Sequence, residues 1–405
     1  MKIRSITYFC NPRYPLDEQV LRAAGEFLSR AKRAYQSAGY EVQTMRLATI
    51  PFPELLGQVH LNELSRFAQQ LEKLLAQIDV GYGSLGPALP EMPRTYQSIP
   101  DAIAATQNMF FSGVMADKRR GLDVAAVRLC ADVIVKAAPL DPNGFANLRF
   151  AALANVPAGA PFFPAAYHSA DQPTFALATE AADLAVEAFT GAASVDEARG
   201  ALVAQIEKHG TALRLVATEL GKETGSPEFG GIDFSLAPFP AEALSLGTAF
   251  ERLGVPAIGL HGSLAAAAIL TESIERADYR RAGFSGLMMP VLEDATLAKR
   301  AAEGNLTVKD ILLYSAVCGT GLDTVPLPGD TSAEQIIPLL LDLCALALRL
   351  DKPLTARLMP VPGKSAGDPT AFDFGFFANS KVMALQSEAL SGPLGAPQAF
   401  ELRKR

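Results

Sequence analysis

One glycine-rich segment holds the residue types best suited to chemistry. Cys318 is followed by Gly319, Thr320 and Gly321, and Asp323 comes two residues later. Glycines on both sides of a threonine let a ligand or another stretch of backbone approach closely. We expect Cys318 on an open loop as a catalytic residue, with Asp323 sharing its site and Gly319, Thr320 and Gly321 contacting a ligand. The alternative is a small buried cysteine in a tight turn.

A catalytic cysteine here needs a nearby cation. A capping pattern at Thr307 predicts a helix that ends near Cys318. The carboxyl end of a helix carries partial negative charge, which raises the pKa of a thiol. A nucleophilic Cys318 therefore requires His261, Arg357 or Lys364 within about 4–6 Å of its sulfur. Arg357 and Lys364 are also candidate ligand-binding residues.

A second candidate site surrounds a histidine. The run Gly259-Leu260-His261-Gly262-Ser263 precedes an alanine-rich stretch with the pattern of a helix. Free N–H groups at a helix start can bind an anion, and His261 could add charge or a proton. We therefore expect Gly262 and Ser263 to contact a ligand, with His261 in a catalytic role. A capped helix with a hydrogen-bonded histidine is the alternative.

Carboxylates offer a conditional metal site. Asp233, Glu293 and Asp294 could hold Mg²⁺ or Ca²⁺ together with Asp323 if the fold brings them together. The sequence has neither a His-x-x-x-His nor a Cys-x-x-Cys pattern, so we do not expect a zinc site of the usual kind. A divalent cation is thus one option, and the identity of any cofactor stays open.

Three familiar nucleotide-binding or catalytic motifs are incomplete. Residues 81–86 fit G-x-G-x-x-G, but Pro90 would break the helix that a dinucleotide site requires. Lys364 follows a glycine as in a phosphate-binding loop, but Leu358 occupies the position of the earlier glycine. Ser285 lies in a glycine-flanked turn that lacks the last glycine of a nucleophile elbow. Ser285 is retained only as a ligand-binding candidate.

Composition excludes several classes of function. The 405 residues are 49% hydrophobic and 20% charged, with a net charge of −7. No broad basic face is available for nucleic acid, and the strongest apolar stretch, 339–350, is interrupted by Asp342 and Arg349 and is too short to cross a membrane. The start of the chain reads as a strand, and four widely spaced cysteines argue for reduced thiols. We expect a cytoplasmic protein with a small-molecule ligand, and self-association into a homo-oligomer is one option.

The elements that position these residues alternate between strands and helices. Ala-rich helical stretches separated by short Val, Ile, Leu and Phe runs indicate an α/β protein. We expect a single domain with a first half (1–156), a helical junction (157–225), a second half (226–385) and a C-terminal tail (386–405). The junction should contain helices at 175–189 and 195–220. The expected strands are 2–9, 41–48, 79–84, 109–115 and 147–155, then 230–236, 256–260, 283–291, 321–326 and 354–360.

Four stretches resemble one family along nearly the whole chain. They are 284–294, 318–330, 354–358 and 377–383, and they resemble the uncharacterised family called domain of unknown function 711, or uncharacterised protein family 0210. The resemblance implies a fold similar to glycyl-radical enzymes such as pyruvate formate-lyase. That fold is a ten-stranded α/β barrel of two five-stranded halves, with a catalytic cysteine on an interior loop, and Cys318 would correspond to it.

The resemblance departs from those enzymes at the radical motif. They carry a C-terminal Arg-Val-x-Gly, whereas this chain has Ser380-Lys381-Val382-Met383-Ala384 without the glycine. We therefore expect no glycyl radical. The sequence favours an enzyme that acts on a small anionic metabolite inside the barrel. The alternative is a catalytically inactive barrel that binds a ligand or forms an oligomer.

Overall fold

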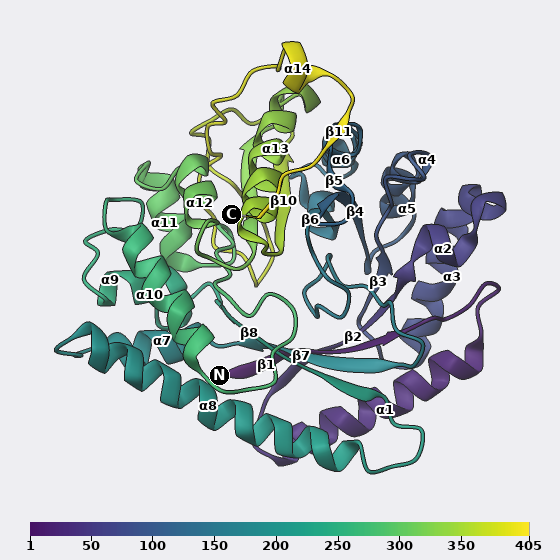
Figure 1. The fold of residues 1–405 in the computed structure, drawn as a ribbon, viewed down its shortest axis with the longest axis horizontal. Coiled ribbons are helices and arrows are strands. Elements are labelled where there is room, and N and C mark those ends of the chain that lie inside the picture. Colours follow the sequence, from purple (N-terminus) through teal and green to yellow (C-terminus); the bar gives the residue numbers. More distant parts are fainter. Residues whose placement is uncertain (405) are drawn as a thin grey trace.

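The computed structural model describes residues 1–404 and shows a mixed α/β protein (Figure 1). An eleven-stranded sheet runs in the order β8-β7-β1-β2-β3-β4-β6-β10-β9, with β5 and β11 attached beside β4. The strands are β1 Lys2–Cys10, β2 Val42–Pro51, β3 Tyr82–Gly86, β4 Met109–Asp117, β5 Gly121–Asp123, β6 Phe150–Ala154, β7 Thr174–Glu180, β8 Glu228–Ala237, β9 Gly321–Pro328, β10 Leu354–Val361 and β11 Ala399–Phe400.

Helices cover the outside of this sheet. The longest, α8, begins where the Ser194 side chain accepts a hydrogen bond from the backbone N–H of Glu197. The helices are α1 Glu18–Ser37, α2 Phe52–Leu56, α3 Leu64–Gln77, α4 Arg94–Gln97, α5 Ile99–Ala105, α6 Val124–Ala137, α7 Ala182–Phe189, α8 Val195–Leu220, α9 Leu246–Arg252, α10 Ser263–Arg276, α11 Ala295–Glu303, α12 Val308–Tyr314, α13 Ala333–Leu350 and α14 Gly392–Gly395.

Strand direction divides the sheet into two groups. The first group, β1, β2, β3, β4 and β6, pairs in parallel throughout. In the second group β7 pairs in parallel with β8, and β9 with β10. The two groups meet in antiparallel pairs, β1 with β7 and β6 with β10. The amino ends of the first group therefore lie beside the carboxyl ends of the second.

The ladder of hydrogen bonds is not continuous between β8 and β9. The segment 281–290 runs between them and forms isolated parallel bridges, Ile232 with Arg281 and Pro290 with Asp323. Each bridge involves a single residue pair, so this segment is not a strand. The structure thus shows an α/β sheet whose two outer strands are not paired with each other but are joined through segment 281–290 by separate bridges and hydrogen bonds.

The helix α1 illustrates how sequence sets the outer layer. Asp17 caps its amino end by accepting from the N–H groups of Gln19 and Val20. Its apolar side chains recur at helical spacing and are buried against the sheet. In Figure 1, α1 and α8 lie beside each other beneath β1, β7 and β8. Burying these apolar faces attaches the outer helices to the sheet.

Some expected elements differ from the structure. The helix expected at 175–189 is instead strand β7 followed by helix α7, because residues 174–180 pair with both β1 and β8. The strands expected at 256–260 and 283–291 are loops with isolated bridges. The expected strands that begin at Lys2 and Met109, and those at 321–326 and 354–360, are present with small shifts in their ends.

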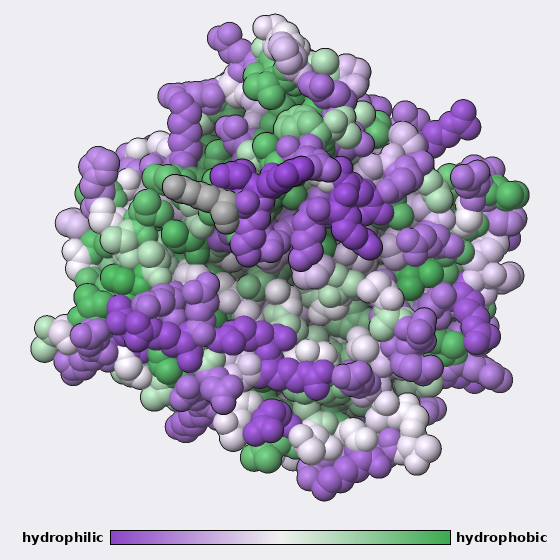
Figure 2. All heavy atoms as spheres, viewed as in Figure 1, coloured by the Kyte–Doolittle hydropathy of each residue, from purple (hydrophilic) through white to green (hydrophobic). Residues whose placement is uncertain are grey.

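The surface carries mixed polar and apolar character. In Figure 2 apolar side chains gather on the side of the view where Figure 1 places α9 to α12. Leu260, Leu264 and Leu313 are among the exposed large apolar residues there. Across residues 1–404 no helix combines the length and the apolar character that crossing a bilayer requires.

Candidate functional site

A cavity of about 100 Å³ opens at the amino ends of the first strand group. Strands β1, β2, β3, β4, β7, β8 and β10 all contribute to its wall. Three arginines reach it, Arg4 from β1, Arg46 from β2 and Arg357 from β10. Six of its twenty lining residues are aromatic, so the cavity combines positive charge with apolar walls.

A buried ion network holds Arg357 in place. Its Nε donates to Oδ1 of Asp323 at 2.5 Å, and its Nη2 donates to Oε1 of Glu293 at 2.7 Å. The other carboxylate oxygen of Glu293 accepts from Arg4. Arg357, Asp323 and Glu293 are 5%, 0% and 3% exposed, so their charges are almost wholly removed from water. The network therefore fixes the Arg357 guanidinium at one wall of the cavity.

The charged groups of this network shift one another's pKa values. Burial alone would raise the pKa of Glu293, but Arg4 and Arg357 outweigh it and the pKa is lowered. Burial raises the pKa of Asp323 against the attraction of Arg357, with a further contribution from the nearby Glu293 charge. Oδ2 of Asp323 is sealed and has no hydrogen-bond partner among residues 1–404. Glu293 is the carboxylate that carries the firm negative charge.

Arg46 differs from the other two arginines. No carboxylate within the described chain forms an ion pair with it, and its Nε donates to Oγ1 of Thr44 at 2.9 Å. The guanidinium lies over the rings of Phe163 and Tyr82, with centroids at 5.1 and 5.7 Å. Burial and the neighbouring Arg4 charge lower the pKa of Arg46 to about 9, which leaves it charged at neutral pH. Within residues 1–404 this cation has no carboxylate in contact, and the Glu293 charge attracts it only from a distance.

Asp233 and Ser285 form a turn at the edge of the cavity. The carboxylate of Asp233 accepts from the N–H groups of Phe284 and Ser285, both at 3.0 Å, and from the hydroxyl of Ser235. The Ser285 hydroxyl donates to the backbone oxygens of Ile232 and Ala282. Burial raises the pKa of Asp233 against these hydrogen bonds. The hydroxyl of Ser285, which was a ligand-binding candidate, therefore already donates to the backbone.

In the structure, the three carboxylates proposed as metal ligands each bond to different protein groups. Asp294 caps α11 and accepts five hydrogen bonds, including those of Ser245 and the N–H groups of Thr296 and Leu297. Asp233 holds the turn just described, and Glu293 is shared by two arginines. Within residues 1–404 no group of three His, Cys, Asp or Glu side chains is arranged to hold a metal ion.

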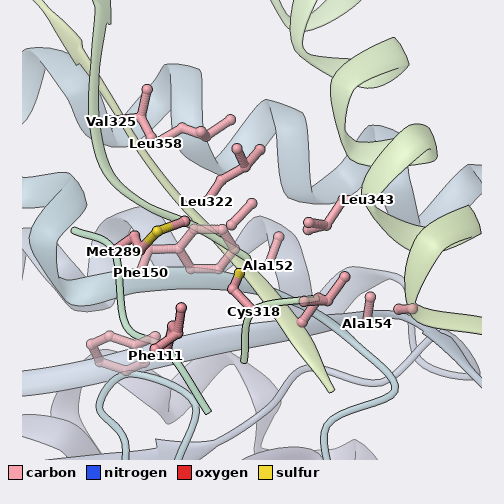
Figure 3. Packing of buried hydrophobic residues seen from close by; sticks show 14 of the residues in the cluster. Phe111, Phe150, Ala152, Ala154, Met289, Cys318, Leu322, Val325, Leu343 and Leu358 are labelled. Carbon is pink, nitrogen blue, oxygen red and sulfur yellow. The ribbon is translucent and has the colours of Figure 1, made fainter. Parts of the chain in front are cut away.

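The structure places Cys318 in the apolar core. It is 0% exposed, and Figure 3 shows it surrounded by Phe150, Met289, Leu322 and other apolar side chains. Lys352 donates to the backbone oxygen of Cys318. The expectation that Cys318 lies on an open loop is therefore wrong. Its environment is that of the alternative interpretation, a small buried cysteine.

Close packing of two glycines explains this burial. A Cβ on Gly286 would lie 2.6 Å from the Cα of Gly319, and one on Gly319 would lie 2.7 Å from the Cα of Gly286. A Cβ on Gly321 would lie 2.4 Å from the backbone oxygen of Thr355. The hydroxyl of Thr320 donates to the backbone oxygen of Leu287 at 3.2 Å. The glycines serve the approach of backbone to backbone, which the sequence could not distinguish from approach of a ligand.

The remaining candidates lie apart from this core. His261 is exposed immediately before α10. The Ser263 hydroxyl donates to the backbone oxygen of Leu260 and accepts from the N–H of Gly259. Gly262 is exposed and Lys364 lies in a partly exposed turn after β10. Of the residues selected from the sequence, the structure brings Arg357, Asp323 and Glu293 into direct contact.

Sequence reasoning missed the other two arginines. Arg4 and Arg46 lie inside strands whose flanking residues are buried, and an arginine in such a strand could have been noted as a candidate. Phe374 and Phe376, which close the cavity from the C-terminal part of the chain, carried no pattern that pointed to it. Their role depends on how residues after β10 fold back across the sheet.

Comparison with known proteins gives matches over nearly the whole chain. The family model described as Uncharacterised ACR (DUF711) matches residues 1–379. A UPF0210 protein of Desulforudis audaxviator is 32% identical over 383 residues, which cover 90% of this chain and 84% of the relative. A UPF0210 protein of Pyrobaculum arsenaticum is 31% identical over 353 residues, covering 84% of this chain and 78% of the relative. These names state no reaction, ligand or partner.

Proposed function

The chain belongs to the uncharacterised DUF711 family, and we propose that it is an enzyme that binds a small anionic metabolite in the cavity lined by Arg4, Arg46 and Arg357. The observation that carries this proposal is the Arg46 guanidinium, which lies in the cavity without a carboxylate partner in the described chain. Arg46 is only partly exposed, and a charge removed from water is costly unless it is paired. A bound anion would supply the missing partner.

The proposed fold is a ten-stranded barrel similar to that of pyruvate formate-lyase. Two features support it: strands of opposite direction meet at β1–β7 and β6–β10, and the segment 281–290 bridges β8 and β9. In this arrangement segment 281–290 takes the place of the tenth strand. Because Ser380-Lys381-Val382-Met383 lacks a glycine, we propose polar chemistry rather than a glycyl radical.

Each part of the cavity has a distinct role in the proposal. Arg46 and Arg357 bind the anion, and their planar guanidinium groups suit two oxygens of one carboxylate or phosphate group. Glu293 and Asp323 orient Arg357 through its Nε and Nη2. Its Nη1 has no protein acceptor among residues 1–404 and stays available to a ligand. The aromatic walls exclude water, which strengthens the attraction between ligand and guanidinium.

A second candidate function is ligand binding without turnover. The observation that favours it is that the acidic side chains around the cavity already have partners: both oxygens of Glu293 accept from arginines, and Asp233 accepts from a turn. Cys318 and Oδ2 of Asp323 are sealed from the cavity. A general base is therefore harder to identify than an anion-binding group.

The experiment is a binding screen followed by a test of turnover. Pure protein is equilibrated with a panel of small carboxylates and phosphates, and retained compounds are identified by mass spectrometry. Arg46→Met should lose the retained anion, whereas the matched control Arg33→Met, on the exposed side of α1, should keep it. Equal retention by the two variants would reject the site. A retained compound that changes chemically on incubation supports the enzyme, and one that stays intact supports the second candidate.

A further inference from the structure

We infer that the ligand of this cavity is a monocarboxylate joined to a compact apolar body, about the size of one small ring. The inference rests on the proposed function and makes it more specific. It depends on three properties of the cavity: where its unmatched charge lies, how many negative charges it already contains, and what covers the rest of its wall.

The unmatched charge belongs to one guanidinium. Nε of Arg46 is occupied by Thr44, while its two terminal nitrogens meet no acceptor among residues 1–404 and are not sealed from the cavity. The central carbon of the guanidinium lies 5.7 Å from the ring centroid of Tyr82 and 5.1 Å from that of Phe163. Two adjacent N–H donors in one plane match the two oxygens of a carboxylate. One anionic group of this shape would complete the site.

A second negative charge would be repelled. Glu293 and Asp233 line the cavity, and Asp323 lies directly behind Arg357. Glu293 and Asp323 already pair with Arg357, and Glu293 also pairs with Arg4. A phosphate monoester carries close to two negative charges at neutral pH, and only one of them would find the unmatched Arg46. The surplus charge would lie near Glu293, so the geometry favours a carboxylate.

Apolar side chains cover most of the remaining wall. Phe110 and Phe163 meet edge to face with their centroids 5.4 Å apart, and Phe162 meets Phe284 in the same way at 5.4 Å. On the other side Phe374 and Phe376 lie 5.4 Å apart. Such walls favour an apolar ligand body over a sugar or a polyol, whose hydroxyl groups would lose hydrogen bonds to water.

The volume limits how large that body can be. A cavity of about 150 Å³ lined by apolar side chains holds one benzene molecule, and the cavity here is smaller, at about 100 Å³, and open to solvent on one side. A nucleotide or a long acyl chain would not fit inside. The largest body that suits this cavity is a short branched chain, or one small ring that extends into the opening, with the carboxylate directed at Arg46.

The test is calorimetric titration with four probes in a buffer free of carboxylate and phosphate. Benzoate carries one negative charge and an apolar ring, benzamide has the ring without the charge, and acetate has the charge without the ring. Phenyl phosphate has the ring and a second negative charge. We expect benzoate to bind at least about tenfold more tightly than each of the others, because one charged hydrogen-bonded pair and one buried ring each contribute that much. Arg46→Met should remove the preference for benzoate over benzamide, and Arg33→Met should retain it.

The outcomes separate the two levels of the proposal. If phenyl phosphate binds more tightly than benzoate and depends on Arg46, the monocarboxylate class is overturned while the anion site stands. If acetate binds as tightly as benzoate, the apolar body is overturned. If Arg46→Met leaves the affinity for every anion unchanged, the anion site and the proposed function fall together. Phe374→Ala provides a second variant, and it should weaken benzoate more than acetate.

Discussion

Replacing Arg46 with methionine should make the ligand-free protein more stable while removing anion binding. Methionine is unbranched and has a similar length, so it can keep the contacts with Tyr82 and Phe163. The change removes a cation that has no carboxylate partner in the described chain. Most substitutions at cavity walls destabilise a protein, so an increase in stability would be a distinctive result.

The expected magnitude follows from the pKa and the contacts that are lost. Burial and the neighbouring Arg4 charge lower the pKa of Arg46 from 12.5 to about 9; at about 1.4 kcal/mol per pKa unit the charged form costs on the order of 5 kcal/mol. The hydrogen bond to Thr44 offsets about 1 kcal/mol. The two ring contacts offset about 1 kcal/mol each. The variant should therefore gain about 2 kcal/mol in the free energy of unfolding.

The sign of the pH dependence is also fixed. Because the folded-state pKa of Arg46 is lower than the unfolded one, the unfolded chain binds the extra proton more readily, and the destabilisation is fully present below pH 9. The stability difference between wild type and Arg46→Met should narrow as the pH rises through about 9. Benzoate binding to the wild type should weaken over the same pH range.

Urea unfolding at pH 7 without ligand provides the assay. Arg33→Met is the matched control, and as an exposed substitution it should stay within about 0.5 kcal/mol of the wild type. The reasoning is refuted if Arg46→Met is less stable than the wild type by about 1 kcal/mol or more, because Arg46 would then have a compensating partner within the protein.

Three further predictions concern the buried groups. Arg357→Met should lower the free energy of unfolding by about 3–5 kcal/mol in urea, since Asp323 and Glu293 would lose their shared partner; unchanged stability would contradict the ion network. Cys318→Ser should cost about 1–3 kcal/mol by adding a hydroxyl to an apolar core, and a neutral effect would indicate polar surroundings. The four cysteines are all buried, and burial raises the pKa of Cys10 to about 12, so an aromatic disulfide reagent should label no thiol until the protein unfolds; rapid labelling of the native state would show an accessible cysteine.

The sequence predicted the α/β class and many of the elements because the relevant signals are local. The capping box of Thr307 and Asp310 at the start of α12 is present as expected. The strand β7 was missed because Thr174–Glu180 runs directly into an alanine-rich stretch, 181–189, that favours helix. Its pairing with β1 and β8 overrides that preference, and such pairing is not visible in one sequence.

The candidate site could be predicted only in part. Arg357, Asp323 and Glu293 were each selected for their chemistry, but their contact depends on how β9, β10 and the segment after 281–290 approach each other. Cys318 was misjudged as open because a glycine that admits a ligand and a glycine that admits another backbone look the same in sequence. Arg46 was missed because an arginine within a strand usually marks a solvent-facing side, and here that side faces a cavity.

The most direct test of the central claim is the ratio of benzoate dissociation constants for Arg46→Met and the wild type at pH 7. The account predicts that the variant remains folded, unfolds at an equal or higher urea concentration, and binds benzoate at least about tenfold more weakly. Equal dissociation constants for the two proteins would contradict the claim that Arg46 awaits an anionic partner in the cavity.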